Sequence, residues 1–178
     1  MIHYIFSRRF RELYDKAVSL YREGRRGSGS YFNASEEAWL KSNGISAQHL
    51  YDYAEDDVSE GEPGYDIALG IEFVRRDYFL NVQKGIPSSQ VLDASNLPPK
   101  SAAVRGIEWL PRIIPKARAK LRGELPASLM YCCGGDRGFF AAHDIHPHEF
   151  LSLIWRAGND DNQIIDWVVG RSANTRSR

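Results

Sequence analysis

Two stretches of the 178-residue chain, one hundred positions apart, decide the fold: residues 10–22 read FRELYDKAVSLYR and residues 110–122 read LPRIIPKARAKLR. In both, apolar residues recur every three or four positions, which is the spacing of one helix face. We predict a helix at each stretch, over about 7–22 and 108–122. Pro115 removes one hydrogen bond from the second helix and should bend it.

The same pattern, with capping and turn residues between the apolar stretches, predicts six further helices. Asn33 and Glu36 resemble a capping box, and Ser46 and His146 are expected N-caps. Five of the ten residues 55–64 are Asp or Glu, and we predict this stretch to be an acidic loop. The six helices are expected at the dipeptides 39–40 and 139–140 and over 46–54, 65–82, 147–155 and 163–169.

A shift of one hundred positions aligns the two halves of the chain without a gap over residues 10–70. Lys16 falls on Lys116 and Tyr31 on Tyr131, and the apolar positions agree better than the identities do. Because each half offers about four short helices and little core of its own, we predict two pseudo-repeated units packed together. The fold class is therefore all-α, with an N-terminal unit (1–83), a proline-containing linker (84–105) and a C-terminal unit (106–178).

Composition narrows the class of protein. The net charge is zero, with −3 in residues 1–100 and +3 in the remainder, so we expect no nucleic-acid partner. No apolar stretch approaches the length of a membrane helix, and no secretory signal is recognisable, so we expect no membrane association. Cys132 and Cys133 are adjacent and unsuited to a structural disulfide, which favours a reducing, cytoplasmic location.

The second half carries a set of short motifs in a fixed order. They are Leu97-Pro98-Pro99-Lys100, residues 106–112 (GIEWLPR), residues 116–119 (KARA), Cys133 with Asp136, and Trp167-Val168. Through these motifs the stretch from Asp93 to Val168 resembles the bacterial family catalogued as domain of unknown function fifty sixty-nine. The resemblance implies an all-helical fold and a bacterial origin, and it implies no activity. Gly134-Gly135 departs from the bulkier residues of that family.

The first candidate site is the loop Cys132-Cys133-Gly134-Gly135-Asp136-Arg137-Gly138, which we expect to open a helix. Backbone N–H groups in a glycine turn and at a helix N-terminus make an anion site, and the same field would favour a nucleophilic Cys133. The structural interpretation stays open: Asp136 caps the helix, the glycines make the turn, and Cys133 fills a small apolar space.

The second candidate is a cationic ridge on the 108–122 helix. Arg112, Lys116 and Lys120 lie four residues apart and share one face, with Arg118 and Arg122 beside them. Such a ridge suits a phosphate, a carboxylate or an acidic protein segment. Salt bridges within the chain are the competing interpretation.

Histidines gather just after the glycine loop, at His143, His146 and His148. Their spacing fits no zinc pattern, so we predict neither a metal site nor a cofactor. Our leading hypothesis is a non-enzymatic module that binds an anionic small molecule or an acidic protein segment through Arg112, Lys116, Arg118, Gly134, Gly135 and Arg137. The alternatives are an enzyme with Cys133 as thiolate nucleophile near Asp136 and His143, and a structural subunit of a larger assembly. A homo-oligomer is a possible partner arrangement.

Overall fold

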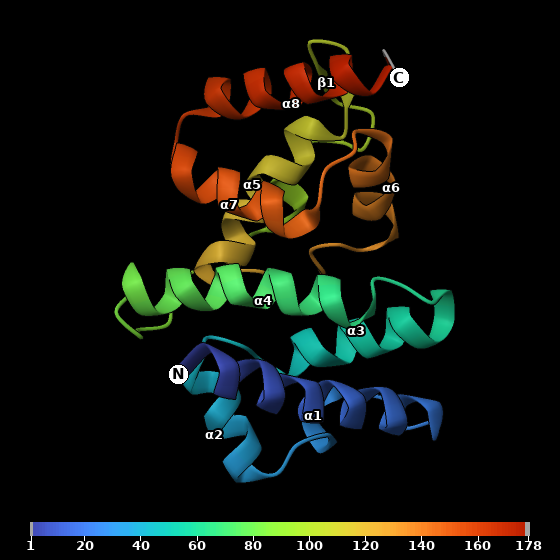
Figure 1. Cartoon of the computed structure of the whole chain (residues 1–178), viewed down its shortest axis with the longest axis vertical. Helices are drawn as coiled ribbons and strands as arrows, with labels where there is room; N and C mark the ends of the chain where they lie inside the picture. The colour runs from blue at the N-terminus through green and yellow to red at the C-terminus, as the bar shows by residue number, and fades with distance from the viewer. Residues whose placement is uncertain (1, 177–178) are drawn as a thin grey trace. The chain divides into compact units, whose positions relative to one another are not determined.

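The structure is a computed structural model that describes the backbone of residues 2–176 and the side chains of 4–173. Within that range the chain forms eight α-helices, two short 3-10 helices and one pair of short strands (Figure 1). The prediction of a helical protein is confirmed, but the strands were not predicted. The chain divides into two compact units, Met1–Ile86 (unit 1) and Pro87–Arg178 (unit 2).

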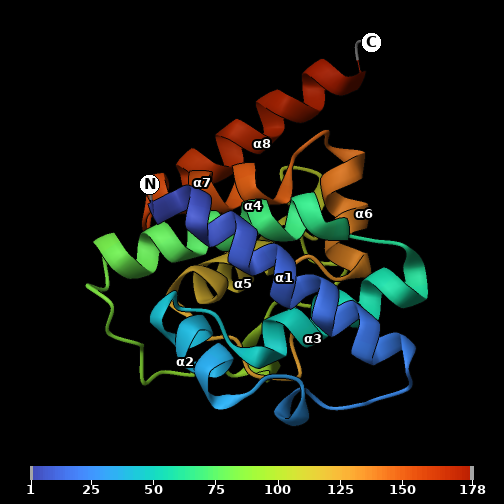
Figure 2. The same cartoon turned by 60° about the horizontal axis from the view of Figure 1, so that its bottom comes forward.

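Unit 1 is built around α1, whose apolar face contacts α3 and, less extensively, α4 (Figure 2). Phe10, Leu13 and Ala17 of α1 are fully buried, together with Leu50 and Tyr53 of α3. The elements of unit 1 are α1 (Ile2–Arg22), η1 (Ser28–Ser30), α2 (Ala34–Ser42), α3 (Ala47–Glu60) and α4 (Gly64–Asn81).

The predicted acidic loop at 55–64 is wrong for its first half, because α3 continues to Glu60. The acids remain helical because tyrosines of α1 bind them: Tyr21 Oη donates to Glu55 over 3.0 Å and Tyr14 Oη donates to Asp57 over 3.2 Å. Gly61 then ends the helix in the left-handed conformation, at φ 76°. Two tertiary contacts thus override the repulsion expected between neighbouring carboxylates.

Unit 2 is organised around α5, which packs against α7, while α7 packs against α8. Leu110, Ile113 and Ala117 of α5 are fully buried, as are Phe150 and Leu151 of α7. The elements of unit 2 are η2 (Ala94–Asn96), β1 (Ala103–Val104), β2 (Ile107–Glu108), α5 (Leu110–Arg122), α6 (Gly134–Ala142), α7 (Pro147–Ala157) and α8 (Asp161–Arg176).

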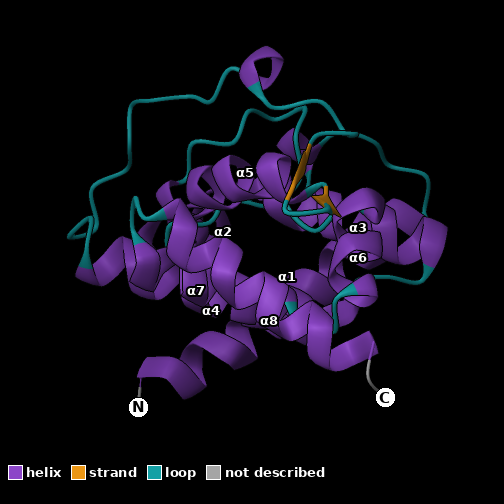
Figure 3. Ribbon diagram, turned by 90° about the horizontal axis from the view of Figure 1, so that it is seen from above, coloured by secondary structure: helices purple, strands orange, loops and turns teal. Residues whose placement is uncertain are grey.

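A hairpin of two strands, each two residues long, precedes α5 and is visible as the orange strands in Figure 3. β1 pairs antiparallel with β2, and Arg105 and Gly106 between them both have positive φ, at 49° and 77°. That combination is typical of the type I′ turn, whose twist matches the strands. The chain then enters α5 through Trp109, which also has a positive φ of 69°.

The segment predicted as a linker makes several contacts with unit 2. Leu92 N–H donates to the Glu124 carbonyl over 2.7 Å, and Ser88 Oγ donates to the Glu124 carboxylate over 2.8 Å. Leu97 is 7% exposed. The division between the two units falls between Ile86 and Pro87, so most of this segment belongs to unit 2.

Two further helix predictions can be compared with the structure. α5 accommodates Pro115 in its second turn, where a single N–H is lost. α8 extends well beyond the predicted 163–169, through Arg171, because Arg171 donates to the Asp144 carbonyl and pairs with Glu149. Within the described residues, no helix combines the length and apolar character that crossing a bilayer requires.

Candidate functional site

Asp136 is the centre of the polar structure in unit 2. It lies in the first turn of α6, where a carboxylate is favoured by the helix dipole, and its side chain is fully buried. It accepts three hydrogen bonds: from Lys116 Nζ over 2.6 Å, from Trp109 Nε1 over 3.0 Å and from the Cys132 backbone N–H over 2.9 Å. Asp136 therefore joins α5, the residue before α5 and the loop before α6.

Lys116 is buried with Asp136, since its side chain is only 2% exposed. Its ammonium has a second neighbour, Cys133 Sγ, at 3.3 Å. Removing one partner of a buried pair leaves the other charge unpaired, which typically costs about 3–5 kcal/mol. The Lys116–Asp136 pair thus fixes the position of α5 relative to α6.

Trp109 and Gly135 depend on each other. A Cβ added to Gly135 would lie 2.5 Å from the indole ring of Trp109, closer than real atoms approach. The ring has little freedom to move aside, because its Nε1 donates to Asp136. Gly135 therefore allows the benzene edge of the indole to approach the first turn of α6 closely, which explains a glycine in the second position of this helix.

Trp109 and Gly135 also line an open hollow of about 360 Å³, which lies between the hairpin and α6. Ile107, Trp109 and Phe139 form an apolar floor, while Lys100 and Glu108 bring opposite charges to the rim. The volume lies near the lower end of the range for small-molecule sites, about 300–1,000 Å³. The full lining is Lys100, Gly106, Ile107, Glu108, Trp109, Gly135, Phe139, Ala142 and His143.

The cations of the predicted ridge mostly bind groups of the chain itself. Arg112 donates to the Pro98 carbonyl over 2.7 Å, and Arg118 donates to the Gly158 carbonyl and pairs with Asp161. Arg137, in the glycine loop, donates to the Cys132 carbonyl over 2.9 Å. These contacts favour the salt-bridge interpretation of the ridge.

The histidines do not converge on one point. His143 Nδ1 lies 2.8 Å from Ser172 Oγ, whereas the rings of His146 and His148 stack with centroids 5.4 Å apart. Burial and the neighbouring His146 lower the pKa of His148. Among the described residues, no three His, Cys, Asp or Glu side chains are grouped as metal ligands.

The two cysteines occupy different environments. Cys132 is fully buried, and burial together with the nearby Asp136 carboxylate raises its pKa to about 12. Cys133 is partly exposed, stands at the N-cap of α6 and contacts Lys116 rather than a histidine. The predicted grouping of Cys133 with Asp136 appears around Lys116, while His143 is bonded to Ser172.

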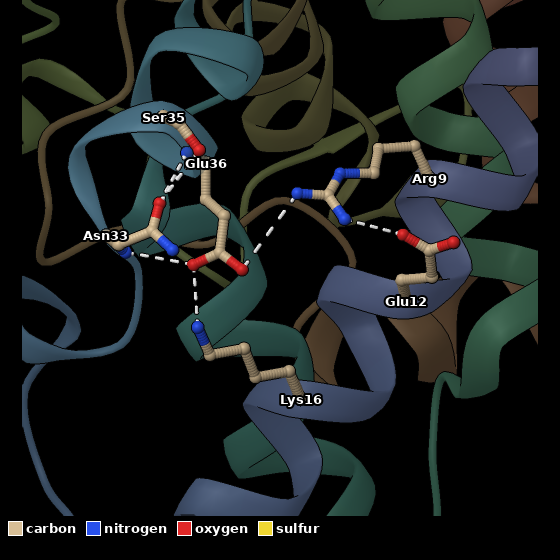
Figure 4. A network of polar contacts seen from close by, with 6 residues as sticks. All are labelled: Arg9, Glu12, Lys16, Asn33, Ser35 and Glu36. Carbon is tan, nitrogen blue, oxygen red and sulfur yellow. Dashed lines mark hydrogen bonds and ion pairs between the residues drawn. The ribbon is translucent and has the colours of Figure 1, made fainter.

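Unit 1 contains a similar polar network (Figure 4). Lys16 Nζ donates to Glu36 over 2.6 Å, and the Asn33 backbone N–H donates to the same carboxylate over 2.9 Å, which completes the predicted capping box. Arg9 lies 4.0 Å from Glu36. The Lys16 side chain is 37% exposed, so this pair is accessible to water.

Unit 2 thus defines a small helical domain with an N-terminal hairpin, in which a buried ion pair supports an open hollow. Residues 97–178 match the family described as Domain of unknown function (DUF5069). The resemblance seen in the sequence is therefore confirmed, and it falls entirely within unit 2. No curated protein and no solved structure was found to match the chain.

Sequence reasoning missed Trp109, Lys100 and Ser172. Trp109 was quoted within a motif, and its position directly before a predicted helix was the available signal, but its Nε1 contact with Asp136 spans 27 residues. Lys100 ends the Leu97-Pro98-Pro99-Lys100 motif within the predicted linker, where no periodicity marks a site. Ser172 lies beyond the last predicted helix, which ended at residue 169, and it belongs to α8.

Proposed function

We propose that unit 2 is a binding module for a small anionic molecule, and that its site is the hollow beside Gly135. The observation that carries the proposal is the lining itself: an aromatic floor of Trp109 and Phe139 with the Lys100 ammonium at the rim. Apolar surface with a few placed polar groups is the usual composition of small-molecule sites.

Lys100 is the best candidate for the cation that meets the ligand. The Lys100 side chain is exposed and has no ion pair within the described part of the chain, whereas Arg112, Lys116 and Arg118 are engaged by neighbouring groups. The site proposed from the sequence therefore moves from the ridge of α5 to the hollow. Gly135 lines the hollow, and it lies with Gly134 in the first turn of α6, where backbone N–H groups attract negative charge.

A thermal-shift screen of carboxylates and phosphates tests the proposal. A ligand at 100 times its dissociation constant adds about 2.7 kcal/mol of stability. We expect at least one anion to stabilise the wild-type chain and to lose this effect in Lys100→Gln. Lys41→Gln, an exposed lysine of unit 1, is the matched control and should keep the effect. Equal stabilisation of both variants, or none of the wild type, would refute the hollow as an anion site.

A second candidate function, thiol chemistry at Cys133, is favoured by the 3.3 Å contact between Lys116 Nζ and Cys133 Sγ. A cation and a helix N-terminus both stabilise a thiolate. Iodoacetamide labelling of folded protein tests this idea, with buried Cys132 as the internal reference. Rapid labelling of Cys133 that slows in Lys116→Met supports it; no labelling before denaturation ends it. Cys133 does not line the hollow, so the binding function remains our first choice.

We also propose that the two units descend from one duplicated unit. Three correspondences support this: α1 and α5 end at Arg22 and Arg122, α2 and α6 span 34–42 and 134–142, and the Lys16–Glu36 and Lys116–Asp136 pairs occupy matching positions. Experimental structures of the units should superimpose over 10–60 and 110–160. Different helix paths over these ranges would contradict the duplication.

A further inference from the structure

The rim of the hollow carries two opposite charges that no other side chain in the described part of the chain pairs. Lys100 and Glu108 both line the hollow and both are exposed. Within the described residues, neither side chain has a hydrogen bond or an ion pair with another residue. By contrast, Arg105, which precedes the lining residue Gly106, is paired with Asp166. An ammonium and a carboxylate therefore remain available at one site.

The floor between these charges suits an apolar or aromatic group. Ile107 and Phe139 are each 5% exposed, and their remaining surface faces the hollow with Trp109 and Ala142. The indole is held in place by its bond to Asp136, so the floor is already formed before a ligand arrives. A preformed site spares the ligand the cost of ordering side chains.

We infer, building on the proposed function, that the ligand is a small zwitterion: a free amino acid, or a close analogue, with an aromatic or branched apolar side chain. Its carboxylate would meet Lys100, its ammonium would meet Glu108, and its side chain would cover Trp109 and Phe139. A simple carboxylate leaves Glu108 unpaired and close to a like charge, so it should bind more weakly than a zwitterion. A simple amine leaves Lys100 unpaired and close to a like charge, so it should bind more weakly for the same reason.

Calorimetry on the full chain with three probes that share one ring tests the inference. The probes are L-phenylalanine, which carries both charges, 3-phenylpropionate, which carries only the carboxylate, and 2-phenylethylamine, which carries only the ammonium. We expect L-phenylalanine to bind at least about tenfold more tightly than either of the others, which corresponds to about 1.4 kcal/mol.

Two charge-removing variants give a crossed pattern that a non-specific apolar site would not produce. Lys100→Gln should weaken L-phenylalanine and 3-phenylpropionate and improve 2-phenylethylamine. Glu108→Gln should weaken L-phenylalanine and 2-phenylethylamine and improve 3-phenylpropionate. Lys41→Gln should leave all three unchanged, since Lys41 lies in unit 1.

The outcomes separate this inference from the proposed function. If 3-phenylpropionate binds as tightly as L-phenylalanine, and Glu108→Gln changes neither, the site takes anions and the zwitterion is wrong. If no probe binds but an anion from the screen still depends on Lys100, the inference again falls and the proposed function stands. If neither probes nor anions depend on Lys100, both are contradicted.

Discussion

Two lysine–carboxylate pairs, one in each unit, share a distance and differ in their surroundings. Lys16–Glu36 and Lys116–Asp136 both have Nζ–O separations of 2.6 Å. In unit 1 the lysine side chain is 37% exposed and a second cation, Arg9, stands nearby; in unit 2 the pair is buried and the indole of Trp109 completes it. Burial, rather than distance, decides what each pair contributes, because water screens the first and not the second.

The largest effect is expected for Asp136→Ala. This change leaves the buried Lys116 ammonium without its carboxylate and removes an acceptor from Trp109 and from the Cys132 N–H. We expect a loss of about 3–5 kcal/mol in the free energy of unfolding. Urea unfolding followed by circular dichroism measures it.

A double variant sharpens this result. Lys116→Met with Asp136→Leu removes both charges and keeps apolar volume, so it should recover most of the loss. A double variant as unstable as Asp136→Ala would mean that the three hydrogen bonds of Asp136, rather than the unpaired ammonium, dominate the effect.

Gly135→Ala should cost less, about 1–3 kcal/mol, which is typical of an overpacked contact. The added Cβ would meet the Trp109 ring at 2.5 Å and displace the indole from the floor of the hollow. Intrinsic tryptophan fluorescence should change together with stability. Gly138→Ala is the matched control, because a Cβ there meets nothing within 4 Å. Equal effects of the two substitutions would contradict the role given to Trp109.

Glu36→Ala, the unit 1 counterpart of Asp136→Ala, should cost about 0.5–2 kcal/mol. The change removes the capping-box partner of Asn33 and an ion pair that water already screens. The same urea titration measures it. A cost as large as that of Asp136→Ala would break the comparison between the two pairs.

The smallest effect concerns pH. Burial raises the pKa of Glu36, but hydrogen bonds from Lys16 and the Asn33 N–H outweigh it, so the pKa lies below the ordinary value of 4.5. Because the unfolded chain takes up this proton first, the contribution of Glu36 is complete above about pH 4.5 and is lost as the pH falls through the lowered pKa. Stability measured from pH 7 to pH 3 should fall less in Glu36→Gln than in the wild type. Identical pH profiles would show that the pKa is not lowered.

Much of the fold could be predicted because helix periodicity and caps are local signals. The capping box at Asn33–Glu36 and the helix ends at Arg22 and Arg122 follow from neighbours in sequence. The hairpin was missed because strands of two residues are too short to show alternation, although Gly106 offered a turn signal.

The site was only partly predictable. The sequence placed Cys133, Gly135 and Asp136 in one loop and Lys116 near it, but it did not predict the direct contacts of Lys116 with Cys133 and Asp136, which span 17 and 20 residues. The sequence pattern of the ridge did not show that Arg112 donates to a backbone carbonyl, or that Arg118 binds a carbonyl and a carboxylate. Charge in a sequence shows which cations exist, whereas the structure shows which of them are already engaged.

The most direct test of the account is the indole N–H signal of Trp109 in ¹H–¹⁵N spectra of the full chain, titrated with L-phenylalanine and with 3-phenylpropionate. The chain has four tryptophans, and Trp109→Phe identifies the signal. We predict a saturable shift of the Trp109 signal, absent in Lys100→Gln, while the Trp39 signal of unit 1 stays in place. A Trp109 signal that does not move, or that moves equally in Lys100→Gln, would contradict the amino-acid site inferred for the hollow.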